Sequence, residues 1–169
     1  MSGFKRARQP KNPLPLHERA LGLLAVRARS RRELQLRLLR VGFERAEVEE
    51  ELDRLEAVGL LNDERFADEL TEHAVCTRKQ GRRAIVGALA AKGIAPGTIA
   101  RAVEDLGEGE EARAVALAAD RARRLTGLPP ETAFRRLFSF LVRRGYDQSL
   151  ARRVATKALQ VEPEGEGET

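Results

Sequence analysis

Apolar residues recur along this chain at spacings of three and four, which is the period of an amphipathic helix. In the central stretch Phe66, Leu70 and Ala74 lie four residues apart and so share one helix face. Nowhere does polar–apolar alternation with β-branched residues persist over five or six positions, the pattern typical of a half-buried strand. The sequence therefore predicts an all-α fold.

The same apolar pattern occurs three times, in register with three glycines. Gly42, Gly93 and Gly145 lie 51 and 52 residues apart. Aliphatic residues lie eight positions before each glycine (Leu34, Ile85 and Leu137) and four positions before it (Leu38, Leu89 and Leu141). An arginine lies ten positions before each glycine (Arg32, Arg83 and Arg135), and a large apolar residue lies one position after it (Phe43, Ile94 and Tyr146). This internal repeat predicts about nine helices, arranged as three tandem three-helix repeats.

Local signals predict where several helices begin. Ser30, with Glu33 three residues later, predicts an N-cap in a capping box. Pro96 suits a first helical turn, where its missing N–H costs nothing. Short polar side chains that accept hydrogen bonds from early N–H groups predict further caps at Asn62 or Asp63, and at Asp147 or Ser149.

Three predictions concern which residues face the core and which face outward. The helix after Ser30 is expected to bury Leu34, Leu38 and Val41. The alanine-rich stretch after Glu110 is expected to pack through a thin face of Ala112, Val115, Ala116 and Ala119. Residues 46–64 hold eight acids against one base. We expect an outer acidic face that docks on a basic partner, stays solvated or pairs with the basic helix beside it, formed by Glu47, Glu49, Glu50, Glu51, Asp53 and Glu56.

These patterns divide the chain into five segments. The expected segments are a flexible basic arm over residues 1–15, repeat 1 over 16–61, repeat 2 over 62–107, repeat 3 over 108–160 and a disordered acidic tail over 161–169. A fragment that ends at Leu106, and so lacks repeat 3, is expected to fold.

Charge points to the kind of partner. The formal net charge is +5, and residues 112–160 alone carry 11 bases against three acids. Arginine outnumbers lysine 26 to 5, which reflects either a GC-rich genome or bidentate recognition of phosphate or carboxylate. A basic body favours nucleic acid or another polyanion.

Paired arginines are the strongest functional signal. Adjacent helix residues point about 100° apart, so each pair spreads over a face, and repetition predicts a basic stripe. The alternative is that some arginines only pair with the acidic third helices. Aromatic residues make up 4% of the chain, so we expect contacts to phosphate or acidic protein rather than stacking on bases. The candidate partner- and DNA-binding residues are Arg31, Arg32, Arg78, Lys79, Arg82, Arg83, Arg135, Arg136, Arg143, Arg144, Arg152 and Arg153.

Motifs of the common enzyme classes are missing, so we expect no catalytic residue, no cofactor and no metal site. The chain has no Gly-rich phosphate loop, no Gly-x-Ser-x-Gly and no His-Glu-x-x-His. His73 and Cys76 lie three apart on one helix, but two ligands do not make a structural zinc site. Cys76 is the only cysteine, and no apolar run approaches 18 residues. We expect a soluble, cytoplasmic monomer that does not bind membranes.

The central stretch also resembles a known family. GLLNDERFADEL, the basic run into Gly81 and the Leu-x-x-Lys-Gly-Ile of residues 89–94 are similar to RecX, the regulatory protein of RecA recombinase. The resemblance covers roughly residues 17–160. Two positions depart from the family pattern. This chain has Ala84 where many relatives have an arginine, and Ala88 where many have a glutamate. The most specific matches are Asp63, Arg65, Phe66, Gly81, Lys92 and Gly93.

The resemblance implies an elongated, curved array of three helical units. It also implies binding along the RecA filament on DNA, with inhibition of strand exchange, ATP hydrolysis and co-protease activity, and hence a role in recombinational repair and the SOS response. Composition alone favours a broader hypothesis, a basic helical-repeat protein that binds single- or double-stranded DNA without a recombinase.

Overall fold

The structure is a computed structural model that describes residues 14–159. Nearly all of the expected basic arm and the whole expected acidic tail lie outside the described residues. Within residues 14–159 the chain forms nine α-helices and one short 3-10 helix, with no strand. It divides into two compact units between Asn62 and Asp63. The all-α prediction is confirmed.

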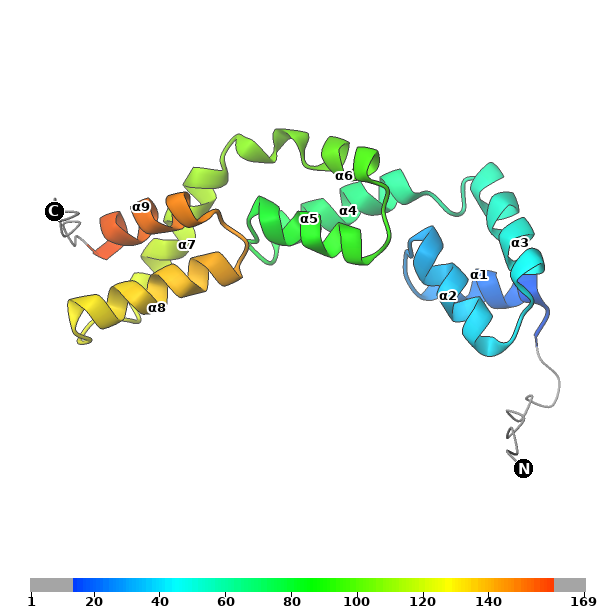
Figure 1. Cartoon of the computed structure of the whole chain (residues 1–169), viewed down its shortest axis with the longest axis horizontal. Helices are drawn as coiled ribbons and strands as arrows, with labels where there is room; N and C mark the ends of the chain where they lie inside the picture. The colour runs from blue at the N-terminus through cyan, green and yellow to red at the C-terminus, as the bar shows by residue number, and fades with distance from the viewer. Residues whose placement is uncertain (1–13, 160–169) are drawn as a thin grey trace, which may run out of the picture. The chain divides into compact units, whose positions relative to one another are not determined.

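The first unit is a three-helix domain. It comprises α1 (Leu16–Val26), α2 (Arg31–Val41) and α3 (Arg45–Ala57), which Figure 1 shows as one group of helices. The three helices enclose one small core. Fully buried side chains from all three helices fill that core, namely Ala20, Leu34, Leu38, Val48, Leu52 and Leu55.

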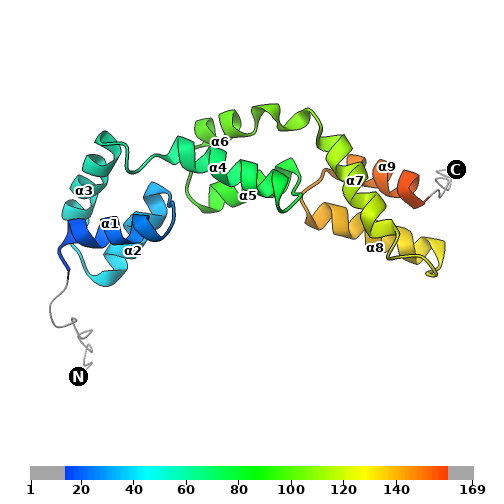
Figure 2. The same ribbon diagram turned by 180° about the vertical axis from the view of Figure 1, so that it is seen from behind.

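The second unit contains two three-helix domains. The first of these is formed by α4 (Asp63–Cys76), α5 (Arg82–Ala91) and α6 (Pro96–Ala102), which is extended by the 3-10 helix η1 (Glu104–Gly107). The other is formed by α7 (Glu110–Ala122), α8 (Pro130–Arg143) and α9 (Gln148–Leu159). Each domain has its own apolar core. Figure 2 shows the same helices from behind.

The glycine register of the repeat is confirmed. Gly42, Gly93 and Gly145 each follow a second helix and have φ of 107°, 77° and 89°, in the left-handed region that favours glycine. The aliphatic residues at the aligned offsets of eight and four are 0% exposed in all three domains, and the aligned arginines are exposed. The three-fold repeat thus predicts both the core and the helix stops.

Two predicted caps are also confirmed. The Ser30 hydroxyl accepts a hydrogen bond from the Glu33 N–H at 3.2 Å. One carboxylate oxygen of Asp147 accepts hydrogen bonds from both the N–H and the hydroxyl of Ser149, at 2.8 and 2.7 Å. Each cap pairs an N–H group that lacks an acceptor within its own helix.

One predicted face is wrong as a whole, and two others are wrong at a single residue each. On α7 the four predicted residues are exposed, and Ala114 and Ala118 are buried instead. Residues 114 and 116 point about 200° apart on a helix, so the prediction took the opposite face. Val41 is 42% exposed because it ends its helix, beyond the buried turn of Leu38.

Glu51 is buried rather than part of an outer acidic face. It stands at the i+3 position from Val48, beside Leu52 on the apolar stripe, and its carboxylate is 2.7 Å from Nδ1 of His17 on α1. The position of Glu51 in the apolar periodicity of this helix therefore already indicated that its side chain is buried.

Candidate polyanion-binding surface

The predicted arginine pairs occupy different helical positions in the three domains. Arg31 and Arg32 open α2, and Arg82 and Arg83 open α5. The third pair does not open its helix, because α8 begins at Pro130 and places Arg135–Arg136 beyond its first turn. The longer α8 explains this difference between the third repeat and the other two.

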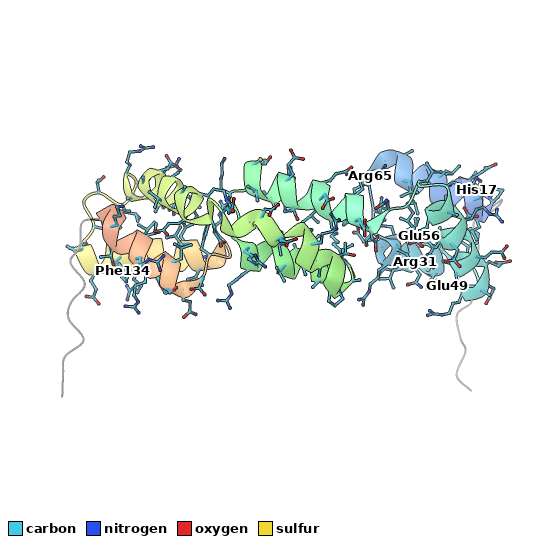
Figure 3. All side chains as sticks on the ribbon, turned by 90° about the horizontal axis from the view of Figure 1, so that it is seen from above. His17, Arg31, Glu49, Glu56, Arg65 and Phe134 are labelled. Carbon is cyan, nitrogen blue, oxygen red and sulfur yellow. The ribbon has the colours of Figure 1, made fainter. Side chains whose placement is uncertain are left out.

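Arg31 is engaged within the first unit. Its guanidinium contacts carboxylates on α3 at 2.9 Å (Glu49), 2.7 Å (Asp53) and 2.7 Å (Glu56). Figure 3 labels Arg31, Glu49 and Glu56 among the side chains of the first unit. Burial lowers the pKa of Arg31, but hydrogen bonds with Asp53 and Glu49, together with the negative charges of Glu56 and Asp53, raise its pKa overall. Here the alternative interpretation, pairing with the acidic third helix, describes the arrangement.

The second pair lies where the two domains of the second unit meet. The Arg82 guanidinium donates to the carbonyl oxygen of Val103 at 2.9 Å, and its backbone N–H donates to the Glu110 carboxylate at 2.7 Å. Arg83 reaches Asp147 at 3.8 Å, but 64% of its side chain remains exposed. Arg82 therefore joins the two domains through its backbone N–H, whereas the charged side chain of Arg83 is mostly exposed to solvent.

Two glycines make this junction possible. The Gly81 N–H donates to the Arg144 carbonyl at 2.8 Å, and the Arg83 N–H donates to the Gly145 carbonyl at 3.1 Å. A Cβ on Gly81 would lie 2.6 Å from backbone atoms of Gly145 and Tyr146, which no side chain tolerates. The start of α5 thus docks on the turn between α8 and α9. Figures 1 and 2 both show the start of α5 beside this turn.

A basic loop before Gly81 is held by the same turn. Arg78 and Lys79 are exposed, but their carbonyl oxygens accept hydrogen bonds from the Arg144 guanidinium and from the Tyr146 hydroxyl, the latter at 3.0 Å. Lys79 has φ of 52° and is the only non-glycine residue between 14 and 159 in the left-handed region. Tyr146 itself is fully buried.

Four arginines line a hollow on α7 and α8. The hollow has a volume of about 510 Å³ and is lined by Arg121, Arg135, Arg136, Ser139 and Arg143. No carboxylate lines it, and none of these four arginines forms an ion pair with another described residue. Three of the four were predicted from the sequence. Arg121 was missed because it belongs to no arginine pair, and only its place in the last turn of α7 brings it to the hollow.

Phe140 connects the hollow to the basic loop. The guanidinium carbons of Arg121 and Arg144 each lie 5.2 Å from the centre of its ring, within cation–π range. Arg144 in turn contacts the carbonyl of Arg78. We use "basic band" for the resulting continuous set of cations, which comprises Arg121, Arg135, Arg136, Arg143, Arg144, Arg78 and Lys79.

The remaining predicted cations have other neighbours. Arg152 lies 6.0 Å from the ring of Phe138, and Arg153 is 3.4 Å from Glu111. Arg32 is exposed on the first unit. Of the predicted residues, the structure thus brings Arg78, Lys79, Arg135, Arg136, Arg143 and Arg144 together in the basic band. These contacts of Arg152 and Arg153 lie outside that band.

The residues of the family motif have mainly local structural roles. Phe66 is buried in its domain core, Arg65 pairs with Glu69 at 3.7 Å on its own helix, and Gly81 forms the junction. Asp63 opens α4, while Lys92 and Gly93 end α5.

The described residues hold neither a metal-ligand cluster nor a membrane-spanning helix. Between residues 14 and 159 there is no group of three or more His, Cys, Asp or Glu side chains that could hold a metal ion. In the same range no helix is both long and apolar enough to cross a membrane. What the basic band can do chemically is bind anions, because guanidinium groups donate bidentate hydrogen bonds to phosphate.

Comparison with known proteins follows the same three-domain division. Sequence models of the RecX family match residues 17–55 as the first three-helix domain, 62–103 as the second and 109–155 as the third. The fold matches two crystal structures. One is RecX from Lactobacillus salivarius, with a TM-score of 0.74 at 19% identity over 86% of this chain and 96% of that one. The other is a regulatory protein RecX, with a TM-score of 0.73 at 22% identity over 87% of this chain and 70% of that one.

Curated relatives are closer in sequence. The chain is 38% identical to "Regulatory protein RecX" of Mycolicibacterium smegmatis over 165 residues, which cover 92% of this chain and 88% of the relative. It is 37% identical to the protein of the same name from Amycolatopsis mediterranei, over 82% of this chain and 79% of the relative. With this identity across all three helical domains, the chain belongs to the RecX family.

Proposed function

We propose that this protein binds a RecA-type recombinase, or its filament on DNA, and inhibits strand exchange, ATP hydrolysis and co-protease activity. Membership of a family whose curated members are named regulatory proteins is the observation that carries the proposal. Inhibition of these activities would make the protein a modulator of recombinational repair and of the SOS response.

The three tandem domains supply a physical means of inhibition. Several weak contacts made by one chain raise its avidity without any single strong site. Contacts of this kind with neighbouring subunits of a helical filament oppose the rearrangements that strand exchange and ATP turnover require. Binding of this kind blocks filament growth or promotes disassembly.

The proposed action includes no catalytic step by this chain. The protein acts as a binding partner, as a monomer in the cytoplasm. The names of its relatives support a regulatory rather than an enzymatic role.

A second candidate function is DNA binding without a recombinase. The observation that favours it is the hollow of four arginines, none of which forms an ion pair with another described residue. A polyanion would relieve the mutual repulsion of these like charges, whether or not a recombinase is present.

Retention on immobilised DNA separates the two functions. We expect the protein to be retained more strongly on DNA coated with its cognate RecA than on bare DNA of the same length at moderate salt. Equal retention on both, lost as salt rises, would favour the second function, because phosphate contacts alone give a log–log salt slope of about −0.9 per neutralised phosphate.

A further inference from the structure

The left-handed backbone of Lys79 needs an explanation. A non-glycine residue in this region is strained and persists only where the surrounding structure holds it. The second domain holds this loop through the N–H groups of Arg78 and Gln80, which donate to the carbonyls of His73 and Ala74 on α4. The third domain adds two hydrogen bonds, since Tyr146 donates to the carbonyl of Lys79 and Arg144 donates to the preceding carbonyl. The third domain therefore helps to hold a loop of the second domain in its conformation.

The hydroxyl of Tyr146 is an addition to the repeat pattern. The aligned residues in the first and second domains are Phe43 and Ile94, which fill the same position without a polar atom. The apolar core thus does not require the hydroxyl. Burial raises the pKa of Tyr146, so at neutral pH its hydroxyl stays protonated and can donate to Lys79.

The hydrogen bonds fix the loop backbone and leave its cations exposed. Both bonds end on carbonyl oxygens, and the side chains of Arg78 and Lys79 remain accessible. Through Arg144 and Phe140 the loop continues into the hollow of four arginines. The result is a row of cations that spans two domains.

A phosphodiester backbone fits this row better than bases or isolated carboxylates do. Phe140 is only partly exposed and already has two guanidinium groups near its ring, so it offers no open platform for stacking a base. A linear polyanion can neutralise the whole row at once, and arginine binds phosphate through two parallel hydrogen bonds.

We propose that the basic band is a composite DNA-backbone site, and that Tyr146 is the positioning residue through which the third domain places Lys79 in it. This inference deepens the proposed function, since it assigns the DNA-contacting surface of the same protein. DNA binding measured without any recombinase tests it separately from RecA regulation.

A double-mutant cycle on the full chain provides the test. Affinities are measured by fluorescence anisotropy for a single-stranded oligonucleotide and for the matching duplex, with Tyr146→Phe, Lys79→Ala and the double variant. We expect Tyr146→Phe and Lys79→Ala each to weaken binding about 3- to 10-fold, a loss of order one phosphate contact. The double variant should be no weaker than Lys79→Ala, because Tyr146 acts through Lys79.

Controls separate positioning from folding and from general charge. Tyr146→Phe keeps the buried ring, so its thermal unfolding should stay within a few degrees of wild type. Lys157→Ala removes an exposed cation near the other end of α9 and should change affinity less than twofold. Arg121→Ala should weaken binding and lower the salt slope by about 1.

A loss on either DNA form supports the site. Wild-type affinity of Tyr146→Phe on both forms would overturn the positioning role, and so would losses that multiply in the double variant. Competition by polyglutamate as effective as that by DNA of equal charge would overturn phosphate recognition.

Discussion

Single residues decide how closely the domains of the second unit approach. Gly145 has φ of 89°, and a Cβ built on it would lie 2.3 Å from Cβ of Ala84. Gly42 occupies the aligned position in the first domain with φ of 107°, but no heavy atom lies within 4 Å of a Cβ placed there. A side chain at this repeat position would therefore strain the backbone in both domains. In the third domain it would also clash with α5, whereas in the first domain it would meet no other atom.

This difference predicts unequal costs for one substitution. Gly42→Ala should destabilise the protein by about 1 kcal/mol, the cost of a left-handed alanine. Gly145→Ala should cost about 3 kcal/mol, because overpacking at the junction adds about 1–3 kcal/mol. Urea unfolding followed by circular dichroism measures both. Equal losses of stability would show that the junction tolerates the extra methyl group.

At the scale of the element, α9 depends on its cap. Asp147 accepts hydrogen bonds from the Ser149 hydroxyl and N–H, and these bonds lower the pKa of its carboxyl. A carboxyl with a lowered pKa binds its proton less tightly in the folded than in the unfolded chain. Its contribution to stability is therefore present above the unfolded pKa and is lost as pH falls through the folded pKa.

Removing the cap should thus matter at neutral pH and not in acid. Asp147→Ala is expected to lower the melting temperature by a few degrees at pH 7. The gap between wild type and variant should narrow as pH falls below about 4, the range in which an aspartate takes up its proton. Ser149→Ala, which keeps the backbone N–H contact, serves as the milder control. A gap that is constant between pH 7 and pH 3 would contradict the role of the charged cap.

The elements also show what local pattern can and cannot predict. Ser30, Pro96 and the three repeat glycines mark helix ends correctly because each acts within a few residues of its own position in the chain. The buried face of α7 was mispredicted because alanines occupy both sides of that helix, so hydrophobicity there does not distinguish inside from outside.

The candidate site was predictable only in part, for a related reason. Arg135, Arg136 and Arg143 stand out as paired arginines, and they do line the hollow. Arg121 and Tyr146 join the surface through tertiary contacts, which no spacing in the sequence encodes. Arg31 shows the converse, because its three carboxylate partners lie 18 to 25 residues away on another helix.

At the scale of the whole molecule, three repeats form two structural units. The second and third domains share backbone hydrogen bonds through Gly81, Arg83, Arg144 and Gly145. A fragment ending at Leu106 would lose every partner of that junction in the third domain but would keep the cores of the first two domains, so its folding stays a prediction. Residue 62 is the better place to divide the chain.

The central claim is that this member of the RecX family restrains a recombinase. The most direct measurement is DNA-dependent ATP hydrolysis and strand exchange by its cognate RecA, with the intact protein added below a one-to-one ratio. We predict that both activities fall well before equimolar addition, because the proposed mechanism has one chain contact several subunits. Unchanged rates at saturating protein, with binding to the filament demonstrated in the same buffer, would contradict the account.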